Sequence, residues 1–291
     1  MITGTFTALI TPFNEKGKID KKALKNLAIE QFKNGINGLV LCGSTGESST
    51  LSHDEHNKII DIVIDAIDNK IPIIAGTGSN STAEAIAMTK DAQKAGAFCS
   101  LQVVPYYNKP TQLGLYKHFK LIADTVDLPM IIYNIPGRCG INLETATLMK
   151  LAKHPNIIGV KESSGNMIQI MDVINQRPKK FSVLSGDDNM ALPVILMGGN
   201  GLISVASNIF PKKIVHMINS ALVGDMKNAR KQHYYLLEFF KAMFIETNPA
   251  PVKTSLALMG KIKPIFRLPL CKMQSENKKR LLKVLHSYKC L

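Results

Sequence analysis

One lysine ends an apolar segment and could act as a nucleophile. Lys161 closes the run NIIGVK at residues 156–161, within the longer stretch NIIGVKESSGN. Burial would disfavour the ammonium form, lower the pKa of the side chain and leave a neutral amine that can attack a carbonyl group. The alternative is a lysine whose charged end reaches solvent from the end of a strand. Alternation along a strand predicts that Lys161 shares a face with Gly159 and that Ile158 lies on the other face.

A tyrosine and an arginine follow the preceding apolar run. Tyr133 lies near the end of PMIIYN at residues 129–134, and Arg138 follows in YNIPGRCG. A phenol beside an amine can transfer protons, although a single buried tyrosine also fits an ordinary core. A guanidinium in such a loop can bind a carboxylate through two hydrogen bonds, or form a surface ion pair. On neighbouring strands, Tyr133 and Lys161 would lie at the same depth.

A glycine-rich turn, GSTGESS, follows the second apolar run. Gly43 and Gly46 allow close approach of the backbone to a ligand, and the amides between them can form an anion-binding nest. Ser44 and Thr45 add hydroxyl groups. Because the turn has neither the lysine nor the spacing of a P-loop, it does not predict nucleotide binding.

Eight apolar runs recur along the chain and would position these residues. They cover residues 7–11, 38–43, 72–78, 98–104, 129–134, 156–161, 181–186 and 201–207. Nearly continuous apolar runs are typical of strands that are buried on both faces of a parallel sheet. Successive runs lie about 20 to 35 residues apart, the size of one strand–helix unit. The pattern predicts an α/β fold, a closed (β/α)8 TIM barrel, with its chemistry at the carboxyl ends of the strands.

An open, doubly wound sheet is the alternative fold. Such a sheet usually carries a glycine-rich dinucleotide fingerprint after its first strand, and the segment TALITPFNEKGK has none. The apolar runs stop at residue 224, and the rest of the chain has helical patterns. We therefore expect a catalytic barrel domain at residues 1–224 and a C-terminal helical domain at residues 225–291.

Helix caps are visible between the runs. Ser52 with Glu55, and Ser81 with Glu84, have the spacing of a capping box. Gly35 has the position expected for the residue that follows the first helix. These signals place helices after the first three strands.

Composition and charge limit the classes of function. The net charge is +14, and nine Lys or Arg against one acidic residue lie in residues 261–291. A basic tail can bind nucleic acid, but no recognition helix or aromatic platform accompanies it, so we expect a solvated surface and no nucleic-acid partner. The positive field would attract small anionic substrates.

No apolar stretch is long enough to span a membrane. The N-terminus lacks a basic leader, and the five scattered cysteines form no C-x-x-C pair, which together predict a cytoplasmic protein with free thiols.

Three motifs together resemble one known family. GSTGE after the second run, YNIPGR after the fifth and GVKESSGN at the sixth resemble the 4-hydroxy-tetrahydrodipicolinate synthases, also called dihydrodipicolinate synthases. This family belongs to the N-acetylneuraminate lyase superfamily of class I pyruvate aldolases. The resemblance covers essentially the whole chain and implies a lyase of the diaminopimelate route of lysine biosynthesis. Another Schiff-base pyruvate aldolase of the superfamily is the alternative.

The resemblance also implies the reaction. Lys161 would form a Schiff base with pyruvate, and the derived enamine would attack the aldehyde of L-aspartate-4-semialdehyde, with no metal and no organic cofactor. Tyr133, the hydroxyl of Ser44 and Tyr107 would form a proton relay, in which Tyr107 reaches in from a partner subunit. The family more often has Thr at position 44, so Ser44 keeps the hydroxyl but lacks the methyl group that restricts its rotamer. A homo-oligomer follows, and the family implies a tetramer built as a dimer of dimers.

The substrate-binding residues also come from the resemblance. Thr45 and the amides around it would bind the carboxylate of pyruvate, in a pocket that Ile203 lines with its backbone carbonyl and to which Gly186 also belongs. Arg138 would bind the carboxylate of the semialdehyde. Sialic acid lyases lack an arginine at this loop position, so Arg138 separates the two branches.

A second set of residues matches the feedback site that binds lysine in inhibited members of the family. The set is Ser48, Ser49, His53, His56, Asn80, Glu84 and Tyr106. A carboxylate beside amide and phenol groups could hold a zwitterion, and some inhibited members have Ala where this chain has Ser49. The pair His53 and His56 could instead suggest a metal, but no third ligand is evident.

Overall fold

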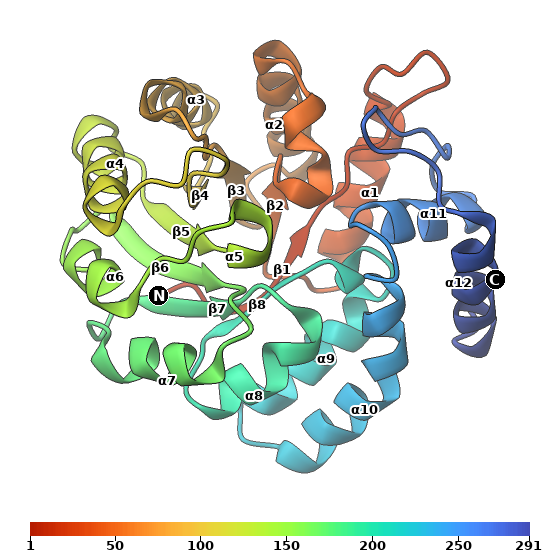
Figure 1. The fold of residues 1–291 in the computed structure, drawn as a ribbon. Helices are drawn as coiled ribbons and strands as arrows, with labels where there is room; N and C mark the ends of the chain where they lie inside the picture. Colours follow the sequence, from red (N-terminus) through yellow and green to blue (C-terminus); the bar gives the residue numbers. More distant parts are fainter.

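Eight parallel strands close into a barrel in the computed structural model, which describes residues 1–291 (Figure 1). The strands are β1 (Gly4–Ala8), β2 (Gly38–Leu41), β3 (Ile73–Gly76), β4 (Cys99–Val103), β5 (Met130–Asn134), β6 (Ile157–Glu162), β7 (Ser182–Ser185) and β8 (Gly201–Ser204). Each strand pairs with the next in the chain, and β8 pairs with β1. The predicted (β/α)8 barrel is confirmed.

Helices surround the barrel. They are α1 (Lys21–Lys33), α2 (His53–Ile67), α3 (Thr82–Lys94), α4 (Gln112–Thr125), α5 (Pro136–Cys139), α6 (Thr145–Leu151), α7 (Met167–Gln176), α8 (Ala191–Leu196), α9 (Pro211–Leu222), α10 (Met226–Ala242), α11 (Ala250–Leu258) and α12 (Ser275–Ser287). Short 3-10 turns lie at the carboxyl ends of three strands: η1 (Ser44–Gly46) and η2 (Ser48–Thr50) after β2, η3 (Asp188–Met190) after β7 and η4 (Ala206–Asn208) after β8. None of the helices is long and apolar enough to cross a membrane.

Of the two predicted capping boxes, the structure contains one in full and half of the other. Ser52 and Glu55 form a complete capping box at the start of α2. Ser81 caps α3 by accepting from the backbone N–H of Glu84, but the carboxylate of Glu84 does not return to the cap. That carboxylate instead interacts with His53 at the start of α2 and with Ser79 in the segment between β3 and α3.

The first strand lies earlier than the predicted run at residues 7–11. β1 covers Gly4–Ala8, and Leu9 and Ile10 follow it. Both side chains are buried, so their hydrophobicity resembles that of a strand. The backbone N–H of Ile10, however, donates to the side chain of Asn208 in η4 at 3.2 Å, and the chain leaves the sheet there.

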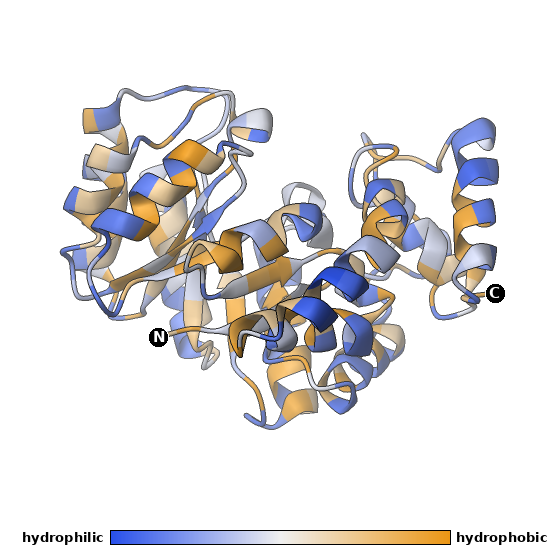
Figure 2. Cartoon of the chain, turned by 90° about the horizontal axis from the view of Figure 1, so that it is seen from below, coloured by the Kyte–Doolittle hydropathy of each residue, from blue (hydrophilic) through white to orange (hydrophobic).

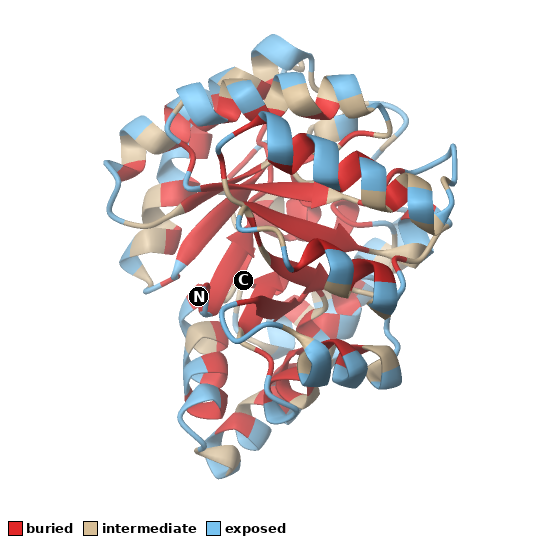
Figure 3. Cartoon of the chain, turned by 90° about the vertical axis from the view of Figure 1, so that its left-hand side faces the viewer, coloured by how far each residue is buried: buried red, intermediate tan, exposed pale blue.

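The hydrophobic core has an inner and an outer part. One residue in two along the strands points into the barrel, where Phe6, Val40, Ile131 and Tyr133 belong to one cluster of 11 buried residues. The outer faces of the strands pack against the helices, and Figure 3 shows buried strands enclosed by helices that are exposed on one side only. Hydrophobic and hydrophilic residues accordingly alternate around most helices in Figure 2. Strands that are buried on both sides explain the continuous apolar runs in the sequence.

One prediction about β6 is wrong. Ile158 packs against the inner cluster, although strict alternation placed it on the face opposite Lys161. The pairing of β5 with β6 skips from Met130–Ile157 to Ile131–Gly159, so Ile158 is an extra residue at a bulge. A bulge shifts the alternation on one side of it, while Lys161 beyond it still points into the barrel.

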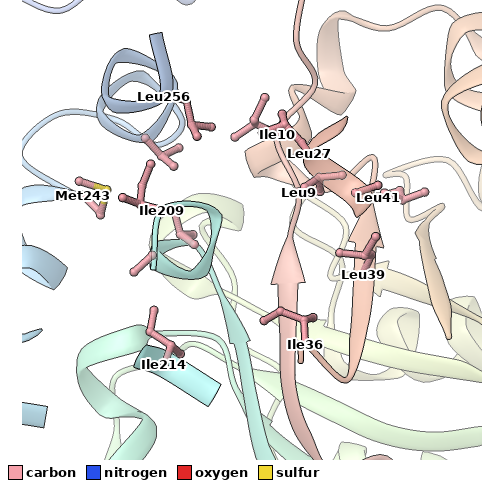
Figure 4. Close-up of a cluster of buried hydrophobic side chains, with 14 of the residues drawn as sticks. Leu9, Ile10, Leu27, Ile36, Leu39, Leu41, Ile209, Ile214, Met243 and Leu256 are labelled. Carbon is pink, nitrogen blue, oxygen red and sulfur yellow. The ribbon is translucent and has the colours of Figure 1, made fainter. Parts of the chain in front are cut away.

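The helices after the barrel pack against its side. Figure 1 shows α10, α11 and α12 lying together beside α1 and α9. In Figure 4, Met243 and Leu256 from this segment lie in the same buried cluster as Ile10 and Ile209 of the barrel. The expected division at residue 224 falls in the turn between α9 and α10, and it stays a prediction.

Candidate active site

Lys161 is buried at the mouth of the barrel. The residue is only 6% exposed, and its Nζ lies 3.9 Å from the centroid of the Tyr133 ring. The two residues are neighbours in the register of β5 and β6. Burial lowers the pKa of Lys161 to about 8, while the negative charges of Asp187 and Asp188 act in the opposite direction. The alternative expectation, in which the charged end of Lys161 reaches solvent, is therefore wrong.

Tyr133 is buried beside this amine. Burial raises the pKa of its phenol, and the nearby charge of Asp187 adds to the increase. The phenol therefore stays protonated at neutral pH. A protonated hydroxyl beside a partly neutral amine can both donate and accept a proton during a reaction at the nitrogen.

A small cavity of about 40 Å³ surrounds the two side chains. Its walls are Ala8, Val40, Gly43, Ser44, Thr45, Leu101, Tyr133, Ile135, Arg138, Lys161, Gly186, Asp187, Val205 and Phe244. The structure thus brings together six of the predicted site residues. They come from the loops after β2, β5 and β7 and from β5 and β6 themselves, all at the carboxyl end of the barrel, as expected for this fold.

Gly186 leaves space for the amine. A Cβ atom at this position would lie 2.8 Å from Cε of Lys161 and 1.9 Å from Oγ of Ser163. Contacts this short do not occur between carbon and other heavy atoms in folded proteins, so any side chain at position 186 would displace Lys161. The requirement for glycine here is one of space.

Asn248 joins Thr45 and Arg138. Its side-chain amide donates to Oγ1 of Thr45 at 2.9 Å, and its backbone carbonyl accepts from Nη2 of Arg138 at 3.1 Å. Asn248 lies in the segment between α10 and α11 and is buried. The segment between α10 and α11 therefore holds two side chains of the cavity in place, a role that the sequence analysis missed.

Glu47 connects the turn after β2 to the same helices. Its carboxylate accepts a hydrogen bond from Nζ of Lys253 in α11, and both side chains are fully buried. Glu47 also has a left-handed backbone, with φ of 56°. Because Glu47 follows Thr45 by two residues, the ion pair fixes the conformation of the turn that lines the cavity.

Two predicted site residues do not line the cavity. Ile203 is fully buried in the barrel interior, where Val205 rather than Ile203 reaches the cavity wall. Tyr107 is 89% exposed and has a φ of 74°. A tyrosine this exposed, in a left-handed conformation, is unusual for a single subunit.

Asp187 and Phe244 line the cavity and were not predicted. The sequence contained a signal for Asp187, because SGDD follows the seventh apolar run in the way that other site residues follow theirs. No local signal marks Phe244 or Asn248, since both come from the helical segment far along the chain. Their place in the site depends on how that segment packs.

The residues of the second set follow β2, β3 and β4 in the chain: Ser48 and Ser49 on η2, His53 and His56 on α2, Glu84 on α3, and Asn80 and Tyr106 in loops. Nε2 of His53 is 2.9 Å from the carboxylate of Glu84, and the amide of Asn80 donates to the carbonyl of Tyr106 at 3.1 Å. A hydrogen bond from Ser79, followed by that from His53, lowers the pKa of Glu84.

The other members of the second set have separate contacts. His56 is buried and contacts the carbonyl of Gly76 through Nε2 at 2.7 Å, so the two histidines have different partners. Ser48 and Ser49 lie on η2. The chain contains no group of three His, Cys, Asp or Glu side chains arranged to hold a metal ion.

Comparison with known proteins agrees with this geometry. The model of the dihydrodipicolinate synthetase family matches residues 1–288. The 4-hydroxy-tetrahydrodipicolinate synthase of Thermodesulfovibrio yellowstonii is 52% identical over 287 residues, which are 99% of this chain and 98% of that protein. This chain belongs to the dihydrodipicolinate synthetase family. As a member, it is a lyase of the class I aldolase type, and the resemblance seen in the three motifs is confirmed.

Two similar crystal structures contain small ligands. The dihydrodipicolinate synthase of Acinetobacter baumannii, complexed with pyruvate, superposes with a TM-score of 0.98 at 41% identity, covering all of both chains. The enzyme of Cyanidioschyzon merolae, with lysine bound, superposes with a TM-score of 0.96 at 40% identity, covering 99% of each chain. The fold around both candidate sites is thus shared with these members of the dihydrodipicolinate synthetase family.

Proposed function

We propose that this chain is a 4-hydroxy-tetrahydrodipicolinate synthase, which condenses pyruvate with L-aspartate-4-semialdehyde. One observation carries the proposal: a buried amine, Lys161, lies against the phenol of Tyr133 in a cavity that also contains Thr45 and Arg138. An amine of lowered pKa can form an imine with a ketone, and the imine can lose a proton to become an enamine nucleophile.

Each further residue of the cavity has a role in this reaction. The turn that contains Thr45 would hold the carboxylate of pyruvate, next to Lys161. Tyr133 would move protons to and from the imine, and Ser44 would extend the relay. The enamine carbon then attacks the aldehyde of the second substrate, whose carboxylate Arg138 would bind. The α-ammonium group of the semialdehyde finally loses a proton, and the resulting amine attacks the imine carbon. Nζ of Lys161 takes up a proton as it leaves, which closes the ring and releases the enzyme.

A reductive trap tests the imine. Borohydride added with pyruvate should reduce the imine and leave a stable mass increase on the peptide that contains Lys161. Lys253 is an internal control, because it is also buried but paired with Glu47, and it should stay unmodified. An unmodified Lys161, in a protein that otherwise binds pyruvate, would overturn the mechanism.

The alternative is another pyruvate aldolase of the same superfamily. Arg138 favours the semialdehyde, because a guanidinium in the cavity complements a second carboxylate. A comparison of kcat/KM for aspartate semialdehyde and for N-acetylmannosamine as partners of pyruvate distinguishes the two. A preference for the sugar would overturn the assignment of the substrate.

We also propose feedback inhibition by lysine at the second set of residues. Glu84 is held ionised beside His53, and Tyr106 and Asn80 lie together, so the site offers both an anion and neutral polar groups to a zwitterion. The structure with lysine bound in a similar protein supports this proposal. Addition of millimolar lysine to the assay tests it, and full activity would contradict it.

A cytoplasmic homotetramer, built as a dimer of dimers, completes the proposal. Two exposed apolar surfaces support it. One contains Tyr106 and Tyr107 between β4 and α4 together with Leu113 in the first turn of α4. The other contains Ile168 and Met171 on α7 with Leu196 and Met197 at the end of α8. Exposed apolar side chains in groups are typical of subunit interfaces. All five cysteines are free, as expected for a protein of a reducing compartment.

A further inference from the structure

Two consecutive aspartates after β7 have different surroundings. Asp188 is completely buried, and its carboxylate accepts hydrogen bonds from the hydroxyl of Ser204 and from the backbone N–H groups of Val205 and Ala206. These bonds satisfy the carboxylate and join η3 to the end of β8. Asp188 therefore has a structural role that its contacts explain.

Asp187 has no comparable partners. Its backbone N–H and C=O bond with the hydroxyl of Ser185, but its carboxylate oxygens neither accept a hydrogen bond nor form an ion pair within the chain. The residue is partly buried and is the only acidic side chain in the wall of the cavity. Burial raises the pKa of this carboxyl, and the charge of Lys161 limits the increase. Partial burial of a carboxylate without a hydrogen-bond partner carries a cost, so a ligand that pairs with it would be favoured.

The charges of the substrates indicate such a ligand. Within the proposed reaction, pyruvate offers a ketone to Lys161 and a carboxylate to the turn at Thr45. L-aspartate-4-semialdehyde offers an aldehyde to the enamine and a carboxylate to Arg138. One charged group of the substrates then has no counterpart, the α-ammonium group of the semialdehyde. One charged group of the cavity also has none, the carboxylate of Asp187.

We propose that Asp187 binds the α-ammonium group of the second substrate and so selects an amino acid aldehyde over an aldehyde without an amine. This inference rests on the proposed condensation and makes Asp187 a residue that determines the specificity of that reaction. Arg138 and Asp187 line the same cavity and both act electrostatically on Lys161 and on Tyr133. Together they would bind the two charges on the α-carbon of the semialdehyde and fix which face of its aldehyde meets the enamine.

A different role for Asp187 would be to keep the pKa of Lys161 from falling further. The two roles predict different outcomes. If Asp187 serves to tune the pKa of Lys161, loss of its carboxylate would change the reaction of Lys161 with pyruvate and would affect every second substrate equally. Loss of an ammonium site would leave the pyruvate step intact and affect only substrates that carry the amine.

The experiment compares Asp187→Asn with the unmodified enzyme on two aldehydes. Aspartate semialdehyde carries the amine, and succinate semialdehyde has the same chain and carboxylate without it. We expect Asp187→Asn to lower kcat/KM for aspartate semialdehyde by about 10- to 100-fold, the effect of one charged hydrogen bond. The kcat/KM for condensation with succinate semialdehyde, measured from the product by mass spectrometry, should change less than about threefold.

Two further variants serve as controls. Asp187→Glu keeps the charge and should recover part of the selectivity. Glu144→Gln removes a carboxylate that is exposed at the start of α6 and outside the cavity, and it should change neither substrate. Borohydride trapping with pyruvate should label Lys161 in all of the variants, which shows that each is folded.

The outcomes separate the two levels of the proposal. An equal loss on both aldehydes, or no loss on either, would overturn the role of Asp187 while the condensation stands. If the unmodified enzyme fails to condense pyruvate with aspartate semialdehyde, the proposed function fails instead, whatever Asp187 does.

Discussion

At the scale of single residues, the central feature is an amine that burial makes reactive. Lys161 is surrounded by the barrel wall and lies against a protonated phenol. Desolvation disfavours its charged form more than Asp187 and Asp188 favour it. The same burial that lowers the pKa of the lysine raises that of Tyr133, so the neutral forms of both groups coexist at physiological pH.

This balance predicts the pH dependence of imine formation. With a pKa of about 8 for Lys161, the neutral fraction of the amine rises with pH and levels off above that value. The rate of trapping with pyruvate should therefore increase about tenfold between pH 7 and pH 9 and then stay constant. Quenched-flow trapping across this range measures it. A rate that continues to rise tenfold per pH unit up to pH 10 would indicate an ordinary, solvated lysine.

Arg138 allows a second prediction at this scale. Arg138→Ala should lower kcat/KM for aspartate semialdehyde about 100-fold, because a charge-assisted contact with the substrate carboxylate is lost. Trapping of Lys161 with pyruvate should remain. Arg138→Lys keeps the charge but not the planar fork and should recover little of the loss. Normal kinetics with the semialdehyde in Arg138→Ala would remove this residue from the site.

At the scale of elements, the turn after β2 and helix α11 act together. Glu47 in the turn and Lys253 in α11 form a buried ion pair, and Asn248 before α11 bonds to Thr45 in the same turn. Lys253 also lies over the ring of Phe13, with Nζ 4.4 Å from the ring centroid. The segment from Asn248 into α11 therefore helps to shape the turn that we propose binds the carboxylate of pyruvate, although it contains none of the predicted catalytic residues.

Removal of Lys253 should consequently be costly. Lys253→Met leaves the carboxylate of Glu47 buried and unpaired, and we expect it to lower the free energy of unfolding by about 3 to 5 kcal/mol. Urea denaturation measures the change. A double variant, Glu47→Gln with Lys253→Met, should recover part of it because no isolated charge remains. Lys241→Met, which breaks an exposed pair with Glu238, is the matched control and should cost less than about 1 kcal/mol. Equal effects of the two single variants would contradict the importance of the buried pair.

At the scale of the whole molecule, the barrel mouth of one chain lacks a residue of the proposed relay. Tyr107 is exposed, has a left-handed backbone conformation and does not line the cavity of its own chain. A partner subunit that inserts its own Tyr107 would explain these observations. Assembly and catalysis would then depend on the same loop between β4 and α4.

A substitution in this loop tests the dependence. Tyr107→Ala should lower kcat at least about tenfold, as expected for loss of a proton-transfer group, and should weaken the assembly in sedimentation velocity experiments. Tyr107→Phe keeps the ring and should preserve the assembly while activity falls. A monomeric wild-type protein with full activity would contradict the shared site. Val223→Ser, at an exposed position in the turn after α9, is a control that should leave both properties unchanged.

The sequence alone predicted the barrel, the order of its elements and the candidate residues at its mouth. Apolar runs and helix caps are local signals, and Lys161 and Tyr133 each end such a run, so their pairing follows from adjacent strands. Thr45 and Arg138 lie in the segments that follow two such runs, at the carboxyl ends of β2 and β5, where this fold places its site. The resemblance of three motifs then implied the proposed reaction.

Only the tertiary structure decided which other residues complete the site. Asn248 and Lys253 reach the turn after β2 from about 200 residues further along the chain, and no local pattern encodes that contact. Asp187 and Asp188 are adjacent residues of the same type. The carboxylate of Asp188 accepts hydrogen bonds at the end of β8, whereas Asp187 lines the cavity. The bulge at Ile158 likewise depends on how β5 and β6 pair. Barrel closure and helix packing bring distant groups into contact, and burial and charge at those contacts are properties of the folded molecule.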